Sequence, residues 1–374
     1  MRLRNAVKAG TIAASLALVG TMLVGLSNYA GAASSPAASA KLTKADIIAT
    51  MKLVDNFWVK SGTNLNPPTW PNATFHVGNL AFVTAGGVSN HVTRPWAQKN
   101  KFQLQSDPKR PFFPDFEAVG EVYLDLLAFH NDPGQLTALR NRLDAEVKSI
   151  KAGNNTYVNY VDALNMALPS FVRIGIMDKK DADVAAAQTL FTYAEKTAGT
   201  HGLFNVAKGL WWRDASFVGT NTYWSRGNGW AIAAMAKLLK VLPAGPFRTE
   251  VLNVFTKMAA AIAPLQRSDG FWNADLGPST TFAGPETSGT AFFTYAMAYG
   301  ISAGILPAAT YKPVVEKAWQ GMVTKAVHSN GLLGFVQGPG KQPSDHQPVK
   351  ATDTAAYGVG GFLLAGSQLT AIES

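Results

Sequence analysis

The sequence predicts an all-α fold, an (α/α)6 barrel in which a ring of six inner helices lies inside six outer helices. Helical spacing of apolar residues runs through nearly the whole chain after residue 42. The predicted helices are of two kinds, and the two kinds alternate along the chain. A weak repeat of turns after the outer helices favours the same arrangement.

The first kind of helix is charged along one face. Between Leu136 and Leu143, apolar residues recur at steps of three and four with Arg and Asn between them, as in a helix that has one side in water. Six segments show this pattern, although Pro95 interrupts the second of them. We expect outer helices at residues 45–60, 88–99, 134–150, 179–197, 247–265 and 311–327.

The second kind of helix has apolar or small residues on nearly every side. Residues 230–236, for example, carry no charge. Helices that are apolar all round are buried all round, and Ala, Gly and Ser let neighbouring backbones come close. We expect inner helices at residues 74–85, 116–130, 162–176, 228–242, 287–306 and 354–369.

A turn with a glycine recurs after three of the outer helices. The glycines of His201-Gly-Leu-Phe, Asp269-Gly-Phe-Trp and Asn330-Gly-Leu-Leu are 68 and 61 residues apart, a spacing that suits a repeat of helical hairpins. Turns of this composition are also common after helices in general, so the alternation of the helices carries most of the prediction.

The N-terminus is typical of a secretory signal peptide. Arg2, Arg4 and Lys8 precede an uncharged apolar stretch at residues 11–26, and the small residues 30–32 offer a cleavage site. A retained membrane anchor is the alternative, but no later segment is apolar for long enough to span a bilayer. We expect a signal peptide at residues 1–33, a low-complexity segment at 34–42, a single catalytic domain at 43–374 and a secreted or extracytoplasmic protein.

The charge and composition narrow the class of ligand. The formal net charge of +9 falls to +6 when the cations Arg2, Arg4 and Lys8 leave with the signal peptide. A mildly basic chain suits an acidic ligand, although ordinary soluble proteins span the same range of net charge.

The chain has no run of Lys or Arg, so we expect no nucleic-acid partner, and it has no cysteine, so we expect no disulfide. No metal motif is present either, and we expect neither a metal nor a cofactor. Composition does not set the oligomeric state.

Polar residues interrupt the apolar pattern where the inner helices begin. In a ring of this kind these helix starts meet at one rim, so the polar residues should surround one opening. Taken singly, each has a plainer interpretation: an aspartate or glutamate as a helix cap, or a histidine as a core residue. The residues are His76, Asp115, Asp162, the segment 226–230, Glu286, Thr287, Ser288 and Asp353.

Tryptophans accompany these helix starts. Trp212, Trp224 and Trp230 are close to them in sequence, and Trp224 and Trp230 flank Arg226. Tryptophan stacks on the apolar face of a sugar ring and arginine clamps an anionic oxygen, so the segment 223–230 is interpreted as a wall of a sugar-binding cleft. A packed loop is the alternative.

Asp162 is the strongest candidate for the chemistry. It lies in an apolar stretch with Met166 one helical turn further on, and apolar surroundings raise the pKa of a carboxyl so that it can donate a proton near neutral pH. Asp115 is the natural second carboxylate. Two carboxylates in one sugar-binding cleft suggest cleavage of a glycoside.

The chain resembles the unsaturated glucuronyl and rhamnogalacturonyl hydrolases, glycoside hydrolase families 88 and 105. The resemblance runs over residues 70–369 in the family's order and implies an (α/α)6 barrel. It is carried by Asp162-Ala-Leu-Asn-Met-Ala-Leu-Pro169, Trp224-Ser-Arg-Gly-Asn-Gly-Trp230, Leu265-Gln-Arg-Ser-Asp-Gly-Phe-Trp272, Glu286-Thr-Ser-Gly-Thr290 and Tyr357-Gly-Val-Gly-Gly-Phe-Leu-Leu-Ala-Gly366.

The resemblance implies removal of a 4,5-unsaturated uronic acid from the non-reducing end of an oligosaccharide left by a polysaccharide lyase. Asp162 would protonate C4 of the enol ether, water would add at C5, and the hemiketal would collapse. Asp115 matches the second family acid, and Arg226 would clamp the substrate carboxylate or ring oxygens. The substrate-binding residues implied are His76, Trp212, Arg213, Trp224, Arg226, Trp230, Glu286, Thr287 and Ser288.

Three positions depart from the family pattern. Residues 203–207 lack a histidine that many members have, Phe116 replaces the second acid of a pair, and Tyr160-Val161 replaces Trp-Cys. These departures leave the substrate and the leaving sugar open. The alternatives are an (α/α)6 glycosidase acting on saturated glucuronides, a lyase of the same fold, and a catalytically silent sugar-binding homologue.

Overall fold

The computed structural model describes residues 42–61, 66–87, 92–130, 132–277 and 282–373. The expected signal peptide lies outside the described residues, as does the low-complexity segment apart from Leu42. Twelve α-helices make up most of the described chain, together with short 3-10 and π turns and one hairpin of two-residue strands, β1 (Phe204–Asn205) and β2 (Leu210–Trp211).

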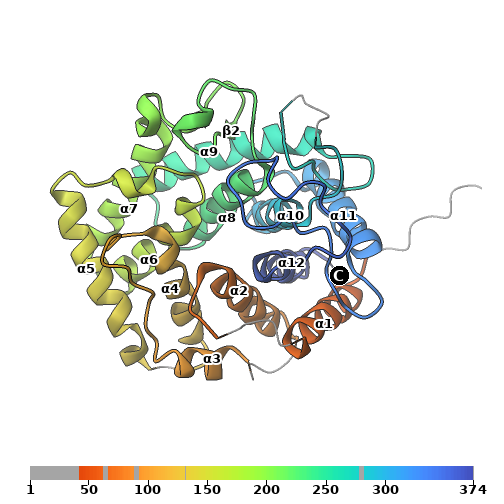
Figure 1. Ribbon diagram of the computed structural model, residues 1–374, viewed down its shortest axis with the longest axis horizontal. Helices are drawn as coiled ribbons and strands as arrows, with labels where there is room; N and C mark the ends of the chain where they lie inside the picture. The colour runs from red at the N-terminus through yellow and green to blue at the C-terminus, as the bar shows by residue number, and fades with distance from the viewer. Residues whose placement is uncertain (1–41, 62–65, 88–91, 131, 278–281, 374) are drawn as a thin grey trace, which may run out of the picture. The chain divides into compact units, whose positions relative to one another are not determined.

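Six helices form a closed inner ring. Each packs on the next along the chain, and the last packs against the first, which closes the ring. Figure 1 shows this ring with the other helices outside it. The inner helices are α2 (Trp70–Thr84), α4 (Pro114–Leu126), α6 (Ala163–Met177), α8 (Ser225–Val241), α10 (Thr287–Ser302) and α12 (Ala356–Leu369).

The outer helices cover the ring with one apolar face each and turn their charged face to water. This confirms the predicted (α/α)6 barrel and the alternation of helix types from which it was predicted. The outer helices are α1 (Lys44–Lys60), α3 (Thr93–Lys99), α5 (Thr137–Lys151), α7 (Asp181–Lys196), α9 (Pro246–Ile262) and α11 (Ala308–Gly321).

Several helix boundaries differ from those predicted. The helix α2 begins at Trp70 and not at residue 74, because Pro71 fits the first turn of a helix, where its missing N–H costs nothing. The segment 225–230 is not a loop but the first turns of α8. The helix α3 spans Thr93–Lys99, shorter than expected; residues 88–91 of the expected helix lie outside the described residues.

The helices α2 and α12 approach so closely that their backbones touch. A Cβ atom on Gly78 would overlap the carbonyl oxygen of Gly360, and a Cβ atom on Gly360 would overlap that of Thr74. The small residues expected to allow close packing therefore lie where the ring closes.

The three turn glycines of the weak repeat share one geometry. Gly202, Gly270 and Gly331 have φ angles of 79°, 90° and 94°, in the left-handed region that glycine adopts readily. Each lies against a backbone carbonyl of an outer helix, on Glu195 of α7, Lys317 of α11 and Leu53 of α1. The repeat is therefore structural: a tight turn that brings the chain from an outer helix towards the inner ring.

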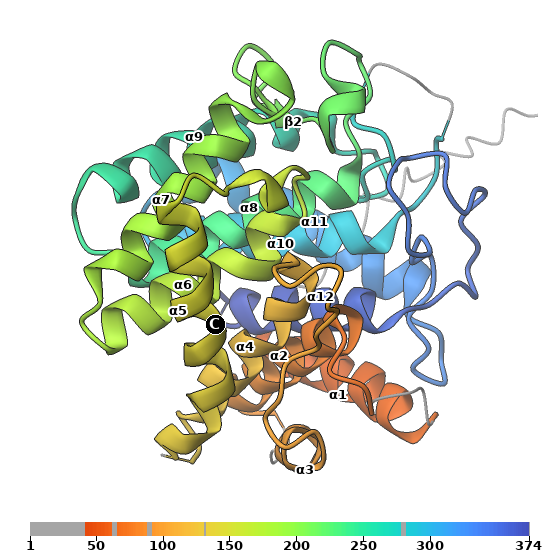
Figure 2. The ribbon, with the colours of Figure 1, turned by 60° about the vertical axis from the view of Figure 1, so that its left-hand side comes forward.

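The two ends of the ring differ. Figure 2 shows the long connection between α11 and α12, drawn in blue, at one end of the ring and the C-terminus of the chain at the other. The inner helices begin at the first end. Among the described helices, none is long and apolar enough to cross a membrane.

We expect Gly360→Ala to destabilise the protein by about 1–3 kcal/mol, because the added methyl group has to push the α2 and α12 backbones apart. The loss should appear as a lower midpoint of thermal unfolding. Gly245→Ala is the matched control, since Gly245 has extended backbone and open space around its Cα. Equal midpoints for the two variants would contradict the tight closure.

Candidate active site

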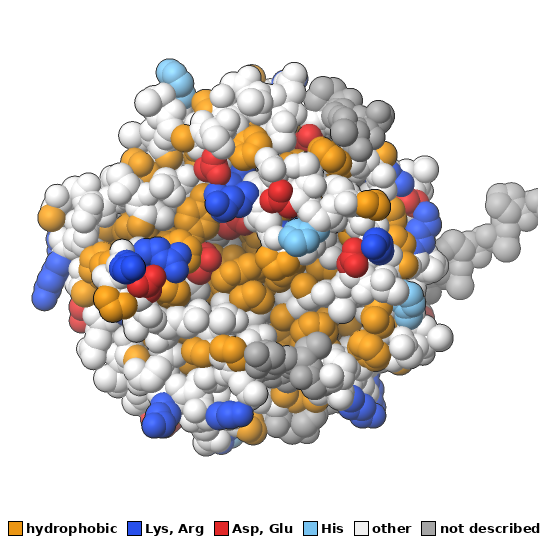
Figure 3. All heavy atoms as spheres, viewed as in Figure 1, with side chains coloured by type: hydrophobic (Ala, Val, Ile, Leu, Met, Phe, Trp, Pro, Cys, Tyr) orange, Lys and Arg blue, Asp and Glu red, His pale blue; other side chains and the backbone are white. Residues whose placement is uncertain are grey.

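The starts of α4 and α6 bring the two predicted carboxylates to one mouth of the ring. Asp115 is the second residue of α4 and Asp162 directly precedes α6. Figure 3 shows this face of the molecule, which is hollowed near its centre, with acidic and basic side chains around hydrophobic ones.

Asp162 occupies the N-cap position of α6 without capping the helix. Its side chain accepts no backbone hydrogen bond from the first turn, and its Oδ2 atom has no hydrogen-bond partner among the described residues. Only 8% of the residue is exposed. The closest cation is Arg213, whose Nε lies 3.5 Å from Oδ2. The helix-capping alternative therefore does not account for Asp162.

The electrostatics of Asp162 fit a proton donor. Burial raises the pKa of Asp162, while the guanidinium groups of Arg213 and Arg226 oppose that rise. The raised pKa is the direction that the apolar sequence around Asp162 predicts. A buried carboxyl oxygen without a hydrogen-bond donor, such as Oδ2 of Asp162, is costly to keep charged, so its surroundings favour a proton on this group.

Asp115 is held by a tyrosine. The Tyr160 hydroxyl donates a hydrogen bond of 2.7 Å to Oδ1 of Asp115. Burial raises the pKa of Asp115 to about 6, against the lowering effect of that hydrogen bond, and the charge of Asp162 raises it further. The Arg213 guanidinium lies 4.8 Å from the centre of the Tyr160 ring, so this cation contacts Asp162 and the tyrosine that holds Asp115.

A short backbone pairing puts Arg213 in this position. The segment around Tyr160 pairs with Asp214 in an antiparallel bridge, and the Val161 amide donates to the Arg213 carbonyl at 2.8 Å. Asp214 accepts from Nη1 of Arg213 at 2.8 Å and so orients the guanidinium. The site is thus assembled from α4, α6 and the connection that follows β2.

Arg226 lies beside this cluster, but its hydrogen bonds go to the protein. It is 1% exposed and donates to the carbonyls of Gln337 at 2.6 Å and Gly338 at 2.7 Å. Its guanidinium also lies over the rings of Trp224 and Tyr357, at 4.4 and 4.9 Å. Arg226 therefore anchors the connection before α12 to the rim, and its role as a carboxylate clamp remains a prediction.

Gln337 ties that connection to the rest of the mouth. Its side-chain oxygen accepts from Nε1 of Trp224 at 2.8 Å, and its backbone amide donates to Oε1 of Glu286 at 3.2 Å. The Tyr357 hydroxyl donates to its carbonyl. Trp224 is 2% exposed, so the indole is a support of the site and not an open stacking surface.

The segment 286–288 caps α10. Glu286 accepts from the amides of Ser288 at 3.0 Å and Gly289 at 2.7 Å, which is the arrangement of a helix cap. The Ser288 hydroxyl donates to the same carboxylate, and the Thr287 hydroxyl donates to the Gly334 carbonyl. All three residues are buried, so the capping alternative describes what the structure shows of them.

Two other predicted site residues point away from the opening. Trp230 is 1% exposed and packs against Phe292, with ring centroids 4.2 Å apart. His76 is fully buried between α2 and α3, where it stacks on Trp96 and shares a hydrogen bond of 2.9 Å with the Thr93 hydroxyl. The structure does not bring these two side chains into the cluster.

Trp212 is the tryptophan of the predicted set that stays half-exposed. It stacks on Tyr223, with ring centroids 5.8 Å apart, and donates from Nε1 to the Thr220 carbonyl. It directly precedes Arg213. An accessible ring next to the charged cluster suits contact with a sugar.

The sequence predicted no site role for three residues that help to build the site: Tyr160, Asp214 and Gln337. Tyr160 was noted only as a departure from the family pattern, although its place two residues before Asp162 would have justified a role. Gln337 lies in a long connection without helical pattern, and nothing in the sequence places it. Among the described residues, no group of three His, Cys, Asp or Glu side chains is arranged to hold a metal ion, and the expected absence of a metal remains a prediction.

Comparison with known proteins identifies the family. Residues 46–372 match the family model of Glycosyl Hydrolase Family 88. The chain belongs to this family. The family acts on unsaturated uronic oligosaccharides, and the chain is a glycoside hydrolase of the unsaturated uronyl hydrolase type. The resemblance inferred from the sequence motifs is thereby confirmed.

Individual relatives cover most of the chain. The unsaturated 3S-rhamnoglycuronyl hydrolase of Alteromonas sp. (strain LOR) is 30% identical over 334 residues, which are 81% of this chain and 78% of that protein. A family 88 glycosyl hydrolase structure from Bacteroides vulgatus has 29% identity and a TM-score of 0.81, and covers 88% of this chain and 99% of its own. A structure named polysaccharide lyase has 29% identity and a TM-score of 0.80, and covers 87% of this chain and 97% of its own.

We expect His76→Phe to make this family 88 protein less sensitive to acid. Burial lowers the pKa of His76 to about 3 from 6.5, so the unfolded chain binds a proton below pH 6.5 that the folded chain does not. Stability from this site is full above pH 6.5 and is lost as the pH falls, by about 2–3 kcal/mol at pH 4.5.

The measurement is the free energy of unfolding in denaturant at pH 7 and pH 4.5. Phe can keep the stacking on Trp96, and Thr93 keeps its hydrogen bond to Asn79. The change between the two pH values should be smaller in His76→Phe than in the parent, whereas His201→Phe, which removes an exposed imidazole, should behave like the parent. An unchanged pH dependence in His76→Phe would contradict the assignment.

Proposed function

We propose that this protein removes a 4,5-unsaturated uronic acid from the non-reducing end of lyase-generated oligosaccharides by hydrating the enol ether, with Asp162 as the proton donor. The observation that carries the proposal is the unused carboxyl of Asp162: it is buried, caps no helix and lies beside a cation at the mouth of the ring. The name of the Alteromonas relative suggests a rhamnose-containing oligosaccharide as the substrate to test first.

The chemistry needs one group that gives a proton and later takes one back. Asp162 in its acid form donates to C4, which leaves electron deficiency at C5 next to the ring oxygen. Water then adds at C5 while the Asp162 carboxylate accepts a proton from it. The resulting hemiketal opens, the bond from C1 to the leaving sugar breaks, and the net reaction consumes one water.

The groups around Asp162 have separate tasks in this proposal. Asp115, oriented by Tyr160, is the second carboxylate of the site. Arg213 is the accessible cation next to Asp162, so it is the first candidate to bind the uronate carboxylate. Trp212 is the accessible ring beside it. The charge of Arg226 lowers the pKa of Asp162.

We also propose that the protein acts outside the cytoplasm. The basic start, the apolar stretch at residues 11–26 and the small residues at 30–32 support export. N-terminal sequencing of protein recovered from the culture medium or periplasm tests this. A mature chain that starts at residue 33 or 34 would support the proposal, and a chain that keeps Met1 would contradict it.

Asp162→Asn tests the proposed function directly. We expect the parent to remove the ultraviolet absorbance of the enol ether from lyase-digested, rhamnose-containing polysaccharide, and Asp162→Asn to lose at least about a thousandfold in rate because it cannot donate the proton. Asp214→Asn is the control, since Asp214 binds Arg213 and Ser216 and has no proton-transfer role in this proposal, so its replacement should lower the rate less. An unchanged rate in Asp162→Asn would overturn the mechanism.

The same assay separates the other functions, of which the lyase is suggested by the name of one similar structure. A lyase would create the absorbance from intact polymer instead of removing it. A glycosidase for saturated glucuronides would release sugar with no change in absorbance. A silent homologue would bind the unsaturated disaccharide without turnover.

Arg213→Met should shift the pH profile of the reaction. The donor works in its protonated form, so activity falls as the pH rises through the pKa of Asp162. Arg213 lowers that pKa, and its removal should move the alkaline limb of kcat to higher pH. Arg94→Met is the control, because Arg94 contacts His130 beyond the other end of α4. An alkaline limb at the same pH in Arg213→Met and the parent would show that the pKa of Asp162 does not determine that limb.

A further inference from the structure

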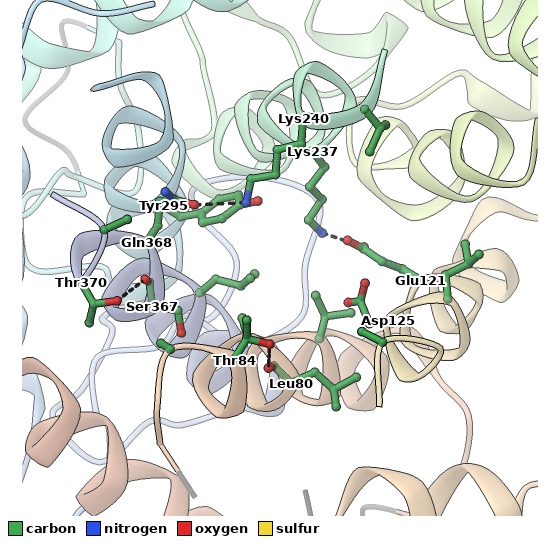
Figure 4. A pocket seen from close by; sticks show the side chains of 18 of the residues that line it. Leu80, Thr84, Glu121, Asp125, Lys237, Lys240, Tyr295, Ser367, Gln368 and Thr370 are labelled. Carbon is green, nitrogen blue, oxygen red and sulfur yellow. Dashed lines mark hydrogen bonds and ion pairs between the residues drawn. The ribbon is translucent and has the colours of Figure 1, made fainter. Parts of the chain in front are cut away.

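A cavity of about 620 Å³ opens at the end of the ring opposite Asp162. It lies between the C-terminal halves of the inner helices; Thr84 and Val241, which line it, are the last residues of α2 and α8. Arg173, also in its lining, is eleven residues beyond Asp162, so about 16 Å of helix separates the two ends. Figure 4 shows this cavity, which we call the basal pocket.

The basal pocket is separate from the candidate active site. Trp230 of α8 and Phe292 of α10 contact each other inside the ring and are each 1% exposed. Along these two helices, both residues come before the ones that line the pocket, Lys237 and Tyr295. Packed aromatic rings therefore stand between the two mouths, and a ligand of the basal pocket would not reach the sugar site.

Two cations on the wall of the pocket are each neutralised by a carboxylate in an ion pair. Lys237 lies 2.7 Å from Glu121, and Arg173 lies 2.6 Å from Asp125. Figure 4 shows the Lys237–Glu121 pair reaching across from α8 to α4. These two acids are thus already used by two cations.

Lys240 differs from these two cations in its partners. Its ammonium donates to the side-chain oxygen of Gln368 at 3.1 Å and lies 4.9 Å from the centre of the Tyr295 ring, but within the described chain no carboxylate is in ion-pair distance of it. Lys44, at the edge of the pocket, likewise has no carboxylate of the described residues within ion-pair distance. The pocket therefore has an excess of positive charge.

Neutralising the helix end does not explain Lys240. Cations often gather where helices end, because the free carbonyls there are negative. At the end of α8, however, Arg248 already donates to the carbonyls of Leu239 at 2.6 Å and Leu242 at 2.9 Å. The Lys240 ammonium instead faces the cavity in Figure 4.

Much of the remaining wall is apolar, although Thr84, Ser367, Gln368 and Thr370 also line it. Val77 and Leu80 of α2, Leu124 of α4 and Leu364 of α12 line it, and Phe129 lies after α4. A cavity of this size is within the range of small-molecule sites, about 300–1,000 Å³, which are typically apolar with a few polar groups. Such a wall binds a hydrocarbon body, and Lys240 supplies one contact for an anionic head.

We propose that the basal pocket binds a small amphipathic carboxylate, with the carboxylate on Lys240 and the apolar body along Leu80, Leu124 and Leu364. This site is independent of the proposed sugar chemistry at the opposite mouth.

Calorimetric titration of the full chain with sodium octanoate tests the proposal. We expect saturable binding to one site, at least tenfold weaker in Lys240→Gln and unchanged in the matched control Lys257→Gln, an exposed lysine of α9. Octanol should bind at least tenfold more weakly than octanoate, because it lacks the charge. Ala81→Leu, which narrows the pocket from α2, should also weaken octanoate binding while Asp162-dependent turnover persists.

Three results would overturn the proposal. They are the absence of saturable octanoate binding, equal affinity of Lys240→Gln and the parent, and equal affinity for octanol and octanoate. Binding of glucuronate at Lys240 without binding of octanoate would likewise show that the occupant is a sugar acid and not an amphipathic carboxylate. Thermal unfolding of each variant confirms that the variants are folded when they are titrated.

Discussion

The backbone contact between α2 and α12 is the constraint on which the rest of the structure depends. Gly78 and Gly360 let the last inner helix pack directly on the first, and this contact turns a row of helical hairpins into a closed ring. Once the ring is closed, every inner helix must begin at the same mouth. Residues as distant in sequence as Asp115 and Arg226 then share one opening.

The site combines two opposing electrostatic effects. Burial makes a charge on Asp162 unfavourable, whereas Arg213 and Arg226 make it more favourable. A carboxyl that donates a proton and later accepts one must be able to exist in both its protonated and its ionised form. The two opposing effects on Asp162 allow both forms. Tyr160 plays a similar part for Asp115, because its hydrogen bond lowers a pKa that burial raises.

The connection before α12 is as important to the mouth as the helices are. Arg226 and Trp224 of the α8 start, Glu286 of the α10 start and Tyr357 all bind Gln337. Several residues that the sequence predicts as ligand contacts thus use their polar atoms for hydrogen bonds to this segment. The predicted site residues that do not bind this segment are fewer: Asp162, Asp115, Arg213 and Trp212.

The sequence by itself determined the barrel and singled out Asp162 as the candidate proton donor, because both inferences follow from local pattern. Apolar residues on every side of a helix require burial on every side, and one carboxyl in an apolar stretch has a raised pKa wherever the stretch packs. The tertiary structure decided which rim residues face the opening. Trp230, His76 and Glu286 carry the same polar or aromatic signals as Trp212 and Asp162, but packing against Phe292, stacking on Trp96 and capping of α10 take them inward. Which way a side chain at a helix start points depends on partners far away in the chain, such as Gln337, and no local pattern encodes them.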